Sequence, residues 1–72
     1  MSTRRLTPYS DIADVLANLP VLIRGARRSR GLSLRAAAAQ IGCGFNTLLR
    51  MENGEDYVMS NALAVVRWLD SA

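Results

Sequence analysis

A glycine between two short helical segments constrains the fold of this chain more than any other feature. The segment before Gly42, residues 34–40, is rich in alanine, and the segment after it, residues 45–52, ends at Asn53-Gly54. Apolar residues recur every three or four positions in both, which predicts amphipathic helices. A left-handed backbone conformation is cheap for glycine, so Gly42 permits a tight turn. The sequence therefore predicts two short helices joined at this glycine.

Two helices joined in this way form a helix-turn-helix pattern, which places its second helix in the major groove of DNA. The charge distribution agrees, because the stretch from Arg24 to Met51 contains six arginines and no acidic residue. The formal net charge is +3, and all nine basic residues are arginine. Arginine forms bidentate hydrogen bonds with phosphate and with guanine. This bias suits a nucleic-acid partner, although a GC-rich genome would also produce it.

Length and composition exclude several other classes of protein. A chain of 72 residues, half of them apolar, has room for one small globular domain. It has no histidine and a single cysteine, Cys43, which argues against a zinc site, histidine-based catalysis or an intramolecular disulfide. We expect Cys43 to be a small buried hydrophobic residue. We also expect no enzymatic activity, no cofactor, no small-molecule ligand and no membrane contact.

Helical spacing outside the motif predicts three further helices and no strand. Thr7 and Pro8 have the residue types that cap and begin a helix. Pro20 begins the next helix, and Gly31 ends it. We therefore expect an all-α, compact five-helix domain. Its expected parts are a flexible arm over 1–6 and a single domain over 7–72, with an extra N-terminal helix over 8–18, a helix-turn-helix motif over 34–52 and a closing helix over 59–70.

Several residues between Leu22 and Leu69 match the pattern of a known family. They are Ile23-Arg24, Arg27, Gly31-Leu32-Ser33, Ala38, Ile41-Gly42, Leu48, Met51-Glu52-Asn53-Gly54 and a closing apolar helix. In these residues the chain resembles the lambda-repressor-like DNA-binding domain of Cro proteins, phage repressors and Xre-type bacterial regulators. The resemblance covers roughly two-thirds of the chain.

The resemblance implies that residues 45–52 form the recognition helix, whose N-terminal end enters the major groove. The implied base-contacting residues are Phe45, Asn46, Leu49 and Arg50. Asn46 suits adenine and Arg50 suits guanine, whereas Phe45 and Leu49 offer only apolar contacts, best placed on thymine methyl groups. The alternatives are that Asn46 caps the local backbone, that Phe45 enters the core and that Arg50 is a solvated charge.

Phosphate contacts and one ion pair complete the implied site. The expected phosphate-contacting residues are Arg24, Arg28, Arg35, Gly44 and Thr47. The resemblance pairs Arg27 with Glu52, which would link the recognition helix to the helix that ends at Gly31. Arg4 and Arg5 would form either a minor-groove arm or a flexible tail.

The pattern also departs from the family. Leu34 stands where the family often has glutamine, and Gly44 replaces the common serine or threonine cap. The family usually has a further C-terminal helix, and we expect the N-terminal helix to replace it. That helix would fold back over the core with Tyr9 or Leu16 near Trp68, so its deletion would unfold the domain.

In the closing helix the expected inward residues are Met59, Ala62, Leu63, Val66 and Leu69.

The sequence thus predicts a sequence-specific DNA-binding transcriptional regulator, most like a small phage Cro protein or repressor acting by operator occupancy. Its expected partner is double-stranded DNA, and its expected location is on DNA in the cytoplasm of a bacterial host cell. We expect a weak homodimer or pairing assisted by DNA. Two alternatives are a protein-interaction module, such as an antitoxin or adaptor, and an excisionase or other architectural DNA binder. Phe45 and Leu49 would also suit a groove on a protein.

Overall fold

A computed structural model of the chain describes residues 7–55 and 57–71, and all regular secondary structure within them is helical. The expected all-α class with five helices is confirmed. The expected arm over 1–6, with Arg4 and Arg5, lies outside the described residues. The helices are α1 (Pro8–Ala17), α2 (Leu19–Ser29), α3 (Leu34–Ile41), α4 (Phe45–Glu52) and α5 (Met59–Asp70).

Local capping residues explain where α1 and α3 begin and where α3 ends. Thr7 Oγ1 accepts a hydrogen bond from the Ser10 N–H at 3.1 Å, and Ser33 Oγ accepts one from the Ala36 N–H at 3.0 Å. Gly42 ends α3 in the left-handed conformation, with φ of 89°. The N–H groups of Gly42 and its successor both donate to the Ala38 carbonyl. The expected tight turn is therefore present.

The conformation of Gly42 leads to a stability prediction with an internal control. Open space surrounds the position of a Cβ at both Gly42 and Gly25, so neither substitution creates a clash. Gly42→Ala should lower the free energy of unfolding by about 1–2 kcal/mol through backbone strain alone. Gly25→Ala, inside α2, should raise it by about 0.5–1 kcal/mol. Urea denaturation followed by circular dichroism measures both changes in the free energy of unfolding. Equal changes for the two variants would contradict the left-handed conformation of Gly42.

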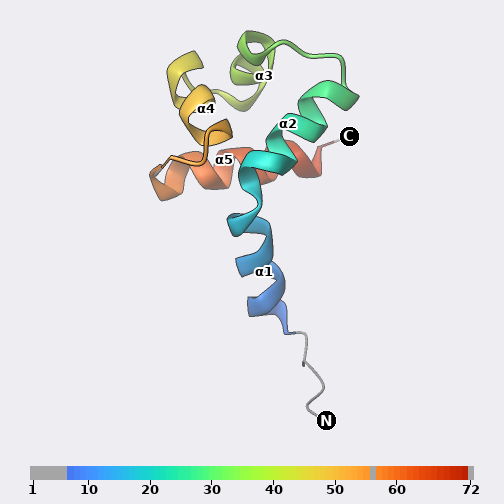
Figure 1. Ribbon diagram of the computed structural model, residues 1–72, viewed down its shortest axis with the longest axis vertical. Coiled ribbons are helices and arrows are strands. Elements are labelled where there is room, and N and C mark those ends of the chain that lie inside the picture. Colours follow the sequence, from blue (N-terminus) through green and yellow to red (C-terminus); the bar gives the residue numbers. More distant parts are fainter. Residues whose placement is uncertain (1–6, 56, 72) are drawn as a thin grey trace.

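The hydrophobic core lies among α2, α3, α4 and α5. In Figure 1, α3 and α4 lie on one side of α5, and α2 passes across it. The largest fully buried side chains come from α2, α4 and α5. They are Leu19, Ile23, Leu48, Met51 and Val65. Ala37 and Ala38 supply the α3 side, and their small side chains fit where helices approach closely.

The inward face of α5 differs from the expected one. Ala62 is buried as expected, but Met59 is 63% exposed and Leu63 is 48% exposed. The core is closed instead by Val65 and Trp68. The Trp68 Nε1–H donates to Gln40 Oε1 on α3 at 2.9 Å. Because α5 is apolar on two faces, periodicity alone could not identify the buried one, and the bulky indole decides it.

The expectation that α1 folds back over the core is wrong. α1 contributes no buried residue, Tyr9 is 82% exposed, and Figure 1 shows the helix projecting away from the other four. A single residue, Asn18, separates α1 from α2, and this link is too short to reverse the chain. Only the end of α1 touches the body: Leu16 packs against the core, and its carbonyl accepts a 3.3 Å hydrogen bond from the Tyr57 hydroxyl. Deletion of α1 would therefore remove no fully buried side chain.

Candidate nucleic-acid interface

The helix α4 has one face in the core and one face exposed. Leu48 and Met51 are fully buried, and this orientation turns Asn46, Leu49 and Arg50 outward. Leu49 is 38% exposed. Three of the four expected base-contacting residues therefore lie on the outer face of α4. Their contact with DNA remains a prediction.

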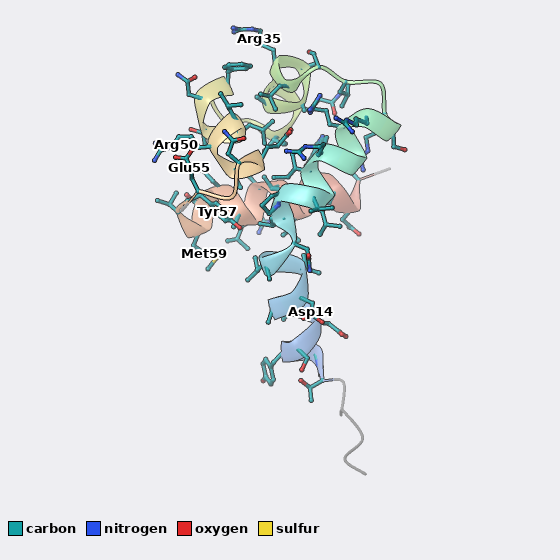
Figure 2. All side chains as sticks on the ribbon, in the orientation of Figure 1. Asp14, Arg35, Arg50, Glu55, Tyr57 and Met59 are labelled. Carbon is teal, nitrogen blue, oxygen red and sulfur yellow. The ribbon has the colours of Figure 1, made fainter. Side chains whose placement is uncertain are left out.

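Phe45, the fourth residue, is half-buried beneath Arg35. The guanidinium carbon of Arg35 lies 4.5 Å from the centroid of the Phe45 ring, which is a cation–π geometry. The contact joins the first turn of α3 to the first turn of α4. Figure 2 shows Arg35 at the outer end of the four-helix body. Phe45 therefore neither enters the core nor stands free, and it positions an arginine beside the start of α4.

The start of α4 lacks a side-chain cap. Gly44 occupies the N-cap position in an extended conformation. Because it has no side chain, no side-chain hydrogen bond caps the first N–H groups of α4. Thr47, in the first turn, is half-buried. Free N–H groups and the helix dipole at such an end favour an anionic group. The two residues expected to hold phosphate here thus lie in the same first turn of α4 as Phe45, over which Arg35 is held.

Arg50 is exposed but paired. Its Nε lies 3.3 Å from Glu55 Oε1, and Figure 2 shows the two residues side by side. Both side chains are at least half exposed, so this surface pair contributes little stability. Sequence reasoning missed Glu55, although the Asn53-Gly54 turn between the two residues signals that the chain folds back here.

A buried carboxylate joins α4 to α2. Arg27 Nε donates to Glu52 Oε2 at 2.8 Å, and Arg27 Nη2 donates to Glu52 Oε1 at 3.2 Å, so the implied ion pair is bidentate. The side chain of Glu52 is only 6% exposed. The hydrogen bond to Glu52 raises the pKa of Arg27, burial opposes this effect, and the attraction of the two charges adds to it. The pair fixes the C-terminal end of α4 against α2.

The arginines of α2 serve different roles. Arg24 lies 3.6 Å from Glu52 Oε1 and donates to the Glu52 carbonyl at 3.4 Å, although its side chain remains 46% exposed. Arg28 is exposed, and no described residue forms an ion pair with it. Of the two expected phosphate contacts on α2, Arg28 is thus the more available.

Arg30 has a structural role that sequence reasoning missed. Its guanidinium donates to the carbonyls of Trp68, Leu69 and Ser71 at 3.0, 3.1 and 2.7 Å, and lies 4.5 Å from the Trp68 ring centroid. These carbonyls end α5, where the helix dipole favours a cation. Ser71, and not a glycine, directly follows α5, and this is the signal that could have indicated an external cap.

Cys43 follows the turn and is half-buried against the core. Burial raises the pKa of its thiol, opposed in part by a backbone hydrogen bond. The thiolate is therefore disfavoured in the folded chain, and the free energy of unfolding should fall as the pH rises above the ordinary thiol pKa.

The partial burial of Cys43 should also slow its modification. At pH 8 we expect a disulfide reagent to label Cys43 at least about tenfold more slowly in the folded chain than in the chain unfolded by urea. Equal rates in both conditions would indicate an accessible thiol.

Comparisons of the chain with protein-family models, with curated proteins and with solved structures found no match. In the described part of the chain, no group of three or more acidic or cysteine side chains is placed to hold a metal ion. Across residues 7–55 and 57–71, no helix has both the length and the apolar character needed to cross a membrane.

Proposed function

We propose that this chain is a sequence-specific DNA-binding transcriptional regulator that places α4 in the major groove. The observation that carries the proposal is the outer face of α4, which presents an amide and a guanidinium while Leu48 and Met51 hold the opposite face in the core. The resemblance to Cro proteins and phage repressors supports a small repressor that acts by occupying its operator, on DNA in the cytoplasm of a bacterial host. No catalytic role is proposed.

The spacing on α4 suits direct reading of base pairs. Asn46 and Arg50 are four residues apart and therefore lie on one face, about 6 Å apart along the helix axis. This separation is close to two steps of stacked base pairs, at about 3.4 Å each. Asparagine pairs with adenine and arginine with guanine in the major groove. Leu49 lies between them and suits a thymine methyl group.

The surroundings of α4 suit contacts with the phosphate backbone. Arg35 is held over the Phe45 ring, so less side-chain freedom is lost when it binds a phosphate. The uncapped start of α4, at Gly44 and Thr47, offers backbone N–H groups to a second phosphate. Arg28 on α2 provides a further exposed positive charge.

Selection of bound duplexes from a random library tests the proposal. At about 150 mM salt the protein should enrich a defined motif, and Arg50→Ala should lose preference at one base position, with about 1–3 kcal/mol of discrimination removed. Arg67→Ala, which removes the same charge from an exposed position on α5, should leave the motif unchanged. If no motif is enriched and the two variants behave alike, the arginines attract DNA without reading its sequence.

A second variant separates phosphate contacts from base contacts. Arg35→Ala should weaken binding to all duplexes alike and reduce the slope of log affinity against log salt by about 1. Fluorescence anisotropy with one selected and one scrambled duplex measures both effects. A loss confined to the selected duplex would instead place Arg35 on a base.

The exposed apolar surface on α4 is small, which favours DNA over a protein groove. Leu49 is only 38% exposed and Phe45 is half-covered by Arg35. A protein-binding site normally presents a continuous apolar patch of several hundred Å². The larger exposed apolar surface of this chain lies elsewhere, between α1 and α5.

A further inference from the structure

A groove lined only by apolar side chains lies between the projecting helix α1 and the helix α5. It has a volume of about 410 Å³. Ile12, Val15 and Leu16 line it from α1, and α5 contributes Met59, Leu63 and Val66 among others. None of the residues around it carries a charge.

The groove is open because, among residues 7–55 and 57–71, nothing covers two apolar stripes. On α5, Met59 and Leu63 occupy the positions that helical spacing predicts to be buried, but the core uses the face with Val65 and Trp68 instead. On α1, Tyr9 and Ile12 recur at helical spacing, yet the helix buries no residue. Each stripe has the pattern of a helix that packs against another helix.

We propose that this groove receives α1 of a second copy of the chain, and that the exchange is reciprocal about a twofold axis. α1 suits the role because it projects from the other four helices, so the groove of a second copy can reach it (Figure 1). With 10 residues it is about 15 Å long, similar to the 12-residue α5 that it would lie against. A twofold interface must be self-complementary, and a chain that carries both an apolar helix and an apolar groove meets this condition.

The charge distribution favours a second copy at this end of the molecule. α1 contains Asp11 and Asp14 and no basic residue. Figure 2 shows Asp14 on α1, far from Arg35 and Arg50 at the other end. Association through α1 therefore keeps the arginine-rich surfaces of two positively charged chains apart. A nucleic acid does not suit the groove, which offers no positive charge.

The exposed apolar area is sufficient for a weak dimer. Tyr9, Ile12, Met59 and Leu63 are 82%, 55%, 63% and 48% exposed. With the groove walls of both copies, a reciprocal contact would bury on the order of 1,000 Å² in total, at the lower end of specific interfaces. We therefore expect a dimer whose formation depends on concentration over the micromolar to millimolar range.

Sedimentation equilibrium without DNA tests the proposal directly. Between about 10 µM and 1 mM, a range that brackets weak association, the chain should change from monomer to dimer. Ile12→Glu and Leu63→Glu should each raise the dissociation constant at least about tenfold, because a charge would be buried at the contact. Val21→Glu is the matched control, since Val21 is 68% exposed but lies on α2 outside the groove. Circular dichroism of each variant shows whether it is folded.

A mixing experiment identifies α1 as the occupant. Tyr9→Lys, on α1 but outside the groove lining, and Leu63→Glu should each be monomeric alone. Their equimolar mixture should associate, because one groove and the helix that enters it are then unaltered, and the other groove contains a lysine–glutamate pair. A wild-type chain that stays monomeric throughout overturns the proposal, as does association that Tyr9→Lys leaves unchanged. Because DNA is absent, either result leaves the proposed function standing. Loss of duplex selection by a chain that still dimerises would overturn that function alone.

Discussion

Replacement of Arg27 by alanine should lower the free energy of unfolding by about 2–4 kcal/mol, because it leaves the buried carboxylate of Glu52 without its bidentate partner. The side chain of Glu52 is only 6% exposed, so water would replace the lost hydrogen bonds only in part. Arg24, at 3.6 Å, would compensate only in part. The effect stays below the upper limit for buried pairs because the side chain of Arg27 is itself 20% exposed.

Urea denaturation followed by helical circular dichroism measures this loss. Arg28→Ala is the control, because it removes the same charge from an exposed position on the same helix and should change stability by less than about 0.5 kcal/mol. The double variant Arg27→Met with Glu52→Leu should lose less than Arg27→Ala, because no buried charge remains. Equal effects of Arg27→Ala and Arg28→Ala would show that the ion pair does not stabilise the fold.

The pH dependence of the Arg27 contribution follows from the direction of its pKa shift. The pKa of Arg27 is raised in the folded chain, mainly by its hydrogen bond to Glu52. The stability that this shift provides is fully present below the pKa of an unfolded arginine, and it is lost only as the pH rises through the higher folded value. Titration of Arg27 should therefore leave stability unchanged across the neutral range.

Replacement of Trp68 by alanine should remove about 3–5 kcal/mol, the range for large aromatic side chains in a core. Trp68 is 6% exposed, donates to Gln40 on α3 and contacts the guanidinium of Arg30, which directly follows α2. Its removal therefore affects three helices and the cap of α5. Because small domains have total stabilities of about 5–15 kcal/mol, this loss is a large fraction of the total, and the variant should unfold at a much lower temperature.

Trp68→Phe separates packing from hydrogen bonding. It keeps most of the buried ring but removes the N–H that donates to Gln40, and it should lose about 1–2 kcal/mol. Gln40→Ala should lose less, because Gln40 is exposed and the indole N–H lies near solvent once the amide is gone. Thermal unfolding followed by circular dichroism ranks the three variants. A Trp68→Ala chain as stable as Trp68→Phe would contradict the central position of this ring.

The ends of the helices could be predicted because the residues that set them act locally. Thr7 and Ser33 each accept a hydrogen bond from a backbone N–H three residues later, and Gly42 turns the backbone at the end of α3. The packing of α5 could not be predicted, because it depends on contacts between residues far apart in the sequence. The direction of α1 could not be predicted, because it depends on the exact residues at which α1 ends and α2 begins. The burial of Trp68 and its hydrogen bond to Gln40 determine which face of α5 packs against the core. The one-residue link at Asn18 directs α1 away from the core.

The candidate site was predictable to the extent that α4 itself determines it. With Leu48 and Met51 buried, the outward position of Asn46 and Arg50 follows from helix geometry. Apart from the Arg27–Glu52 pair that the resemblance implied, the partners of the arginines did not follow, because one residue type pairs equally well with carboxylates, carbonyls, rings and phosphates. Arg30 caps α5 and Arg35 covers the Phe45 ring, and the spacing of these residues in the sequence indicates neither contact.

The attachment of α4 at both ends has a consequence for the proposed complex. Before its first turn, the Cys43 N–H donates to the Ala38 carbonyl, and at its last turn Glu52 is held by Arg27. A helix fixed in this way cannot tilt or slide to improve its fit in a groove. Adjustment would then fall to the duplex, which must twist or bend around a rigid probe. Base pairs that the protein never touches would in this way influence affinity through their stiffness.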